Sequence, residues 1–135
     1  MSSHRRLSII AAISGLYDLV VGALLLLIPV QVAGWFGSAP PSPVINANLN
    51  GMFLVAVGAG YLLPYRDPAR YRGYLWVMGP LLKGGGAFIF VLDYLFRGSP
   101  VAFLLFAASD GLLALVTFAA LVQTTDTAES RPPSR

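Results

Sequence analysis

Four long apolar segments, separated by short polar or proline-rich stretches, dominate the pattern of this chain. They cover residues 7–28, 44–63, 73–96 and 101–122. Each has about 20 residues or more, the length that an α-helix needs to cross the hydrocarbon core of a bilayer. The pattern therefore predicts an all-α protein in which a single four-helix transmembrane bundle, residues 7–122, forms the only domain.

The first apolar segment follows Arg5 and Arg6, so a signal peptide is an alternative reading of it. The apolar core of a signal peptide normally has only about 7–15 residues and carries no charge. This segment is longer and contains Asp18. We therefore expect a retained helix that ends at Pro29.

The connecting stretches differ in character. Residues 30–43 carry no charge but include Trp35, Phe36 and three prolines, which is typical of a loop or short helix at the level of the lipid headgroups. Residues 64–72 form a basic loop, and residues 97–100 a tight turn. Residues 1–6 form a short polar tail, and we expect residues 123–135 to form a disordered one.

Charge is scarce and unevenly placed. The chain is 56% hydrophobic and only 11% charged, less than half of the roughly 25% that soluble domains carry. Most arginines lie in the two tails and in the 64–72 loop, whereas Arg97 lies alone on the opposite side. Positively charged segments stay in the cytoplasm, so we expect both termini there and a multi-pass protein of the cytoplasmic membrane. The same distribution argues against nucleic acid as the anionic partner of a chain with net charge +3.

Each apolar segment contains one strongly polar residue near its middle: Asp18, Asn50, Lys83 and Asp110. At 1.5 Å per residue these four positions fall within roughly 8 Å of one plane, so an antiparallel bundle can bring them together. Asn46 lies one helical turn before Asn50 on the same face. Intramembrane charges cost about 2.5–3.5 kcal/mol each and normally face the bundle interior and pair.

This predicted cluster has two interpretations. With every group ionised, two carboxylates and one ammonium leave one negative charge, so the carboxylates could share a proton or bind a cation. Alternatively, buried polar residues only hold helices together, at about 0.6–2 kcal/mol for each hydrogen bond. Asp93 is a separate case, because Arg97 four residues later favours an ion pair at the membrane surface.

Glycine and proline surround the predicted cluster. Pro80 lacks an N–H group and should kink or loosen the helix beside Lys83, with help from the glycines at 79 and 84–86. Broken helices at membrane depth line cavities or meet other helices, and either reading fits here. Gly51, Gly58 and Gly60 should let a neighbouring helix approach the second span closely.

The residue types exclude several kinds of site. The chain has no cysteine, and its single histidine, His4, lies in the N-terminal tail. Thiolate, iron–sulfur and histidine-ligated metal or haem sites in the membrane are therefore excluded. No set of catalytic residues stands out, which favours a role other than catalysis.

Two stretches carry a resemblance to a known group. They are Gly-Leu-Tyr-Asp-Leu-Val-Val-Gly at residues 15–22 and Gly-Ala-Gly-Tyr-Leu-Leu at residues 58–63. With the four spans, they make the chain similar to the DoxX-like small membrane proteins. The resemblance implies a four-helix bundle and, as in some members of that group, a link to quinone redox chemistry. Small multidrug transporters also have four spans and an acidic residue in the first, but Lys83 and Asp110 argue against that family.

Three functional hypotheses follow. In the first, the cluster binds a small molecule with a polar headgroup, or a quinone, in a redox-accessory role. In the second, a homodimer acts as a proton-coupled transporter, and in the third, the chain is a structural subunit of a larger membrane complex.

Overall fold

The structure is a computed structural model, and it describes residues 3–129. All regular elements in this range are helical. They are α1 (Ser3–Leu27), α2 (Pro29–Trp35), α3 (Ile45–Gly60), α4 (Leu62–Arg66), α5 (Arg72–Trp76), the π-helix η1 (Val77–Lys83), α6 (Gly84–Arg97), the 3₁₀ turn η2 (Val101–Phe103) and α7 (Leu104–Glu129).

Four helical stretches are long and apolar enough to cross a membrane. They are His4–Leu27, Ile45–Arg66, Arg72–Arg97 and Val101–Thr124. The predicted all-α, four-span architecture is therefore confirmed, and the uncharged stretch after Pro29 contains the short helix α2. Helix α7 continues to Glu129, so the tail expected to be disordered is helical over residues 123–129, and its remainder lies outside the described residues. The cytoplasmic location of the termini stays a prediction.

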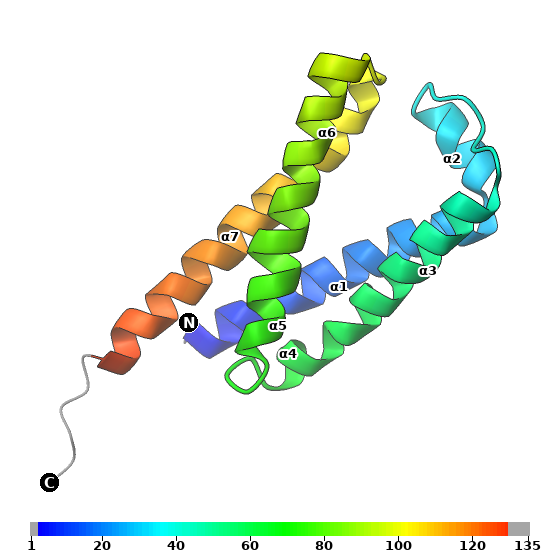
Figure 1. The fold of residues 1–135 in the computed structure, drawn as a ribbon. Coiled ribbons are helices and arrows are strands. Elements are labelled where there is room, and N and C mark those ends of the chain that lie inside the picture. Colours follow the sequence, from blue (N-terminus) through cyan, green and yellow to red (C-terminus); the bar gives the residue numbers. More distant parts are fainter. Residues whose placement is uncertain (1–2, 130–135) are drawn as a thin grey trace, which may run out of the picture.

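The spans form two helical hairpins (Figure 1). Helices α1 and α3 run side by side in the first hairpin, and α5, η1 and α6 run beside α7 in the second. The hairpins lie together near the start of α1, where α4 and α5 meet, and they spread apart toward α2 and the far end of α6. The two hairpins are thus packed together at one end, which we call the closed end, and diverge at the other, where α2 lies between them.

Glycines allow the first hairpin to pack backbone against backbone. A Cβ atom at Gly22 would lie 2.7 Å from the carbonyl oxygen of Gly51, and one at Gly58 would lie 2.8 Å from that of Gly15. Such close approach excludes side chains from the contact and suits Cα–H···O interactions between helices. The predicted role of Gly51 and Gly58 as contact residues is confirmed, and Gly60 similarly makes room for the Tyr74 side chain.

A small apolar core fills the closed end. Its buried members come from both hairpins: Leu7, Ala11, Val57, Tyr61, Leu75 and Leu121. Many large apolar side chains elsewhere point outward, as Leu16, Leu115 and Phe96 do. Outward-facing leucine and phenylalanine on four apolar helices suit a protein surrounded by lipid tails.

The third span contains a wide helical turn at the predicted position. Residues Val77–Lys83 form a π-helix with Pro80 inside it. Proline cannot donate the usual backbone hydrogen bond, and single π turns inside α-helices absorb this kind of defect. The loosening expected from Pro80 is therefore observed, without a break in the helix.

We predict that Gly22→Ala destabilises the protein by about 1–3 kcal/mol, because the added methyl group overpacks a contact made by backbone atoms. Thermal unfolding in a mild detergent measures the change. Gly85→Ala is the matched control, since a Cβ there meets nothing within 4 Å. Equal stability of the two variants would contradict the close backbone contact.

Candidate functional site

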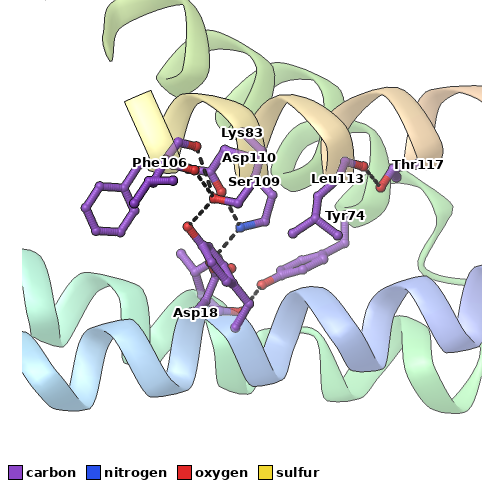
Figure 2. Close-up of polar contacts among 11 residues, drawn as sticks. Asp18, Tyr74, Lys83, Phe106, Ser109, Asp110, Leu113 and Thr117 are labelled. Carbon is purple, nitrogen blue, oxygen red and sulfur yellow. Dashed lines mark hydrogen bonds and ion pairs between the residues drawn. The ribbon is translucent and has the colours of Figure 1, made fainter. Parts of the chain in front are cut away.

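Lys83 lies at the centre of a buried charge cluster between the two hairpins (Figure 2). Its Nζ donates to Asp18 Oδ1 at 2.6 Å and to Asp110 Oδ1 at 3.2 Å. Lys83 is only 4% exposed and Asp18 only 1%. The ammonium also lies 4.7 Å from the ring centroid of Tyr17. Three of the four residues predicted to share one depth are therefore in direct contact.

The cluster joins different parts of the fold. Asp18 lies on α1 in the first hairpin, whereas Lys83 ends η1 and Asp110 lies on α7 in the second. A hydrogen bond beside the cluster also joins the two hairpins, because the Tyr17 hydroxyl is 2.8 Å from Ser109 Oγ. These contacts connect the hairpins at the point where they begin to diverge.

A cleft of about 620 Å³ extends from the cluster into the space between the diverging hairpins. Asp18, Lys83 and Asp110 lie at its inner end, and α2 with the following loop lies at its outer end. This volume falls within the range of roughly 300–1,000 Å³ that small-molecule sites occupy. Apart from the charged cluster, the lining is mainly apolar and includes Val21, Leu25, Val32, Phe53, Leu54 and Leu82.

Four phenylalanine rings form one wall of the cleft, which we call the aromatic wall: Phe36, Phe90, Phe103 and Phe106. The Phe36 and Phe106 rings stack with centroids 4.8 Å apart, and the Phe90 and Phe106 rings with centroids 5.6 Å apart. Offset stacks of this kind stabilise by about 0.5–1.5 kcal/mol beyond the area they bury. The wall therefore holds α2, α6 and α7 in place around the cleft.

The asparagines are placed differently from the charged residues. Asn50 lines the cleft, but the described residues give it no hydrogen bond with the cluster, and its role in ligand binding stays a prediction. Asn46 is exposed and does not line the cleft. It is Asn48 that faces α1, where its side-chain amide donates to the carbonyl oxygens of Leu25 and Leu26 at 3.5 and 3.2 Å.

Some site residues were not expected from the sequence. Tyr17 could have been identified from the sequence, because it is the residue directly before Asp18. Phe36 could not, because only the path of α2 brings it to Phe106. At the far end of α6, the predicted Asp93–Arg97 ion pair is confirmed at 3.0 Å, and the Ser99 hydroxyl also donates to Asp93.

The acidic residues in the described part of the chain are not grouped as metal ligands. Within the described residues, no group of three or more histidine, cysteine, aspartate or glutamate side chains is close enough to hold a metal ion. Lys83 occupies the position between the two carboxylates that a cation would take. The arrangement is suited to hydrogen bonding and charge pairing with an organic ligand.

Comparisons with known proteins add nothing to this picture, because no family model, curated protein or solved structure matches the chain. The resemblance to the DoxX-like group therefore stays a prediction that rests on the two sequence stretches 15–22 and 58–63.

We predict that Lys83→Met lowers the free energy of unfolding by about 3–5 kcal/mol, because it leaves two carboxylates buried without their cation. Chemical denaturation in mixed micelles measures the loss. A triple variant, Asp18→Asn with Lys83→Met and Asp110→Asn, removes every charge and should recover most of the stability. Unchanged stability of the single variant would show that the ion pairs do not hold the hairpins together.

Proposed function

We propose that this small integral membrane protein binds a small amphipathic molecule in the cleft. The ligand's polar group meets the cluster of Asp18, Lys83 and Asp110, and its apolar body lies along the aromatic wall. The observation that supports this most directly is the open volume of about 620 Å³ beside a buried charge cluster. Intramembrane ionisable groups mark binding sites or ion pathways by default.

A purely structural role explains the cleft less well. Side chains that only hold helices together need no open volume next to them, and packing around them lowers the free energy further. Here Asp110 remains 17% exposed, and the cleft reaches it from the side of α2. The protein leaves the cluster accessible at one end of the bundle while closing the other end with its core.

Two ligand types fit an amphipathic site of this shape. One is a lipid-like molecule with a polar headgroup, and the other is a quinone with its ring at the cluster and its chain toward the cleft mouth. The resemblance to the DoxX-like group favours the quinone, in which case the protein has a redox-accessory role. The electrons would then be exchanged between the quinone and a partner protein in a larger membrane complex.

Transport is a second candidate, supported by the bundle's closure at one end only. A transporter exposes its central site to one side of the membrane at a time, and a cleft that ends at midplane charges has this form. Such a protein, acting as a dimer, should show solute flux in proteoliposomes that follows an imposed pH gradient. Asp18→Asn should abolish that flux.

We predict that Gly86→Leu prevents a ligand from binding in the cleft. Gly86 lines it, and a Cβ there meets nothing within 4 Å, so the larger side chain enters open volume instead of displacing packed atoms. Protein purified in mild detergent is extracted with organic solvent, and small molecules are compared by mass spectrometry. A compound that copurifies with the wild-type protein should be lost from the variant.

Gly85→Leu is the control for this experiment. Gly85 is the neighbouring residue, its Cβ position is equally free, and it does not line the cleft. The control should retain the copurifying compound at the wild-type ratio. Extracts that are identical for all three proteins would contradict ligand binding in the cleft.

A further inference from the structure

Most hydrogen-bond donors of the charged cluster are already in use. Two of the three Lys83 N–H bonds point to carboxylates, and its ammonium lies over the Tyr17 ring. The Ser109 hydroxyl donates to backbone carbonyls, with Oγ 2.9 Å from Leu105 O and 3.2 Å from Phe106 O. The Tyr17 and Ser109 hydroxyls also share a 2.8 Å hydrogen bond in which either can be the donor.

The acceptors at the same place are not all in use. Asp18 Oδ2 is buried and has no hydrogen-bond partner among the described residues. The hydrogen bond that Asp110 receives from Lys83 likewise goes to Oδ1 alone. An ionised carboxylate accepts about four hydrogen bonds, and a buried oxygen that receives none costs free energy. The cluster thus has more acceptors than it fills, and the carboxylate of Asp110 is the one that remains partly exposed.

The cluster has a surplus of negative charge as well as a surplus of hydrogen-bond acceptors. Two aspartates and one lysine leave one negative charge when all three are ionised. A cation that enters the cleft brings the total to zero in a region where charges interact strongly because water is largely excluded. An anionic group would instead meet two carboxylates and a lysine that is already paired.

The remaining lining fits the rest of such a cation. The aromatic wall of Phe36, Phe90, Phe103 and Phe106 extends from the cluster toward the cleft mouth. Aromatic rings pack well against aryl or alkyl groups, and their faces attract cations. We propose that the ligand is a protonated organic amine whose N–H groups bond to Asp110, the accessible carboxylate of the cluster, and whose apolar body lies on the aromatic wall. This inference rests on the proposed function and specifies the ligand's polar group as a cationic amine instead of a quinone ring.

A matched series of probes tests the ligand class. Phenylbutylamine, phenylbutanol and phenylbutanoate have one aromatic body and differ in a group that is cationic, neutral or anionic near neutral pH. A short-chain ubiquinone accepts hydrogen bonds but donates none, and it represents the quinone alternative. Each is titrated by calorimetry into protein in lipid nanodiscs, and the signal from empty nanodiscs is subtracted to remove partition into lipid.

We expect saturable binding of the amine, about tenfold or more tighter than that of the alcohol, and no saturable binding of the carboxylate. Gly86→Leu should abolish amine binding, and Gly85→Leu should leave it unchanged. Asp110→Asn should weaken it by about tenfold or more while Lys83 keeps its bond to Asp18. Gly86→Leu does not alter the charged residues, so the test stands even if an aspartate variant fails to fold.

Two outcomes would overturn the inference in different ways. If the ubiquinone or the carboxylate binds in a manner that Gly86→Leu abolishes and the amine does not, the amine assignment is wrong but ligand binding in the cleft stands. If the amine binds equally to the wild type and to Gly86→Leu, it does not bind in the cleft. That result, together with identical solvent extracts, would remove the proposed function as well.

Discussion

The need to neutralise the Lys83 ammonium within a bilayer is the constraint on which the arrangement of the spans depends. A single charge at that depth costs several kcal/mol, and here two carboxylates from different helices compensate it. Asp110 belongs to the same hairpin as Lys83, but Asp18 belongs to the other, so the shorter of the two ion pairs forms only when the hairpins lie together. The same ion pairs that make Lys83 tolerable therefore determine how the two halves of the bundle meet.

The two hairpins achieve their internal packing by different means, and the cleft is the result. In the first, Gly15, Gly22, Gly51 and Gly58 bring the backbones of α1 and α3 into contact. The apolar core occupies only the closed end. At the other end, the stacked phenylalanine rings join α2 to α6 and α7 beside the open volume of the cleft. Close packing in one place thus leaves open volume in another.

Much of this arrangement follows from residue order alone, because a membrane leaves few alternatives to straight apolar helices. The four spans, the common depth of Asp18, Lys83 and Asp110, and the defect at Pro80 were all predictable from counts along the chain. The rotation of each helix about its own axis was not predictable in this way. Asn48 and Asn50 differ by two residues, about 200° around a helix, so which one faces α1 depends on packing that the sequence pattern does not reveal.

The position of Phe36 was unpredictable for a related reason, since it depends on how a short helix folds back over the cleft. The sidedness of the termini and the relationship to the DoxX-like group depend on information outside the chain's own geometry. What the sequence does convey is the depth of each group in the membrane, and depth was sufficient to identify the charged cluster.

The π-helix has a consequence for how this chain can change over time. The buried positions of the third span, Leu75, Gly79, Lys83 and Ala87, recur at intervals of four residues. In a regular α-helix, with 3.6 residues per turn, each such interval drifts by about 40°, and the wider turn over Val77–Lys83 absorbs this drift. Adding one residue to the α-helical turns before that stretch would turn everything after it by about 100° and carry Lys83 away from its carboxylates. Here the number of residues matters more than their identity, so insertions and deletions should be rarer in this segment than substitutions.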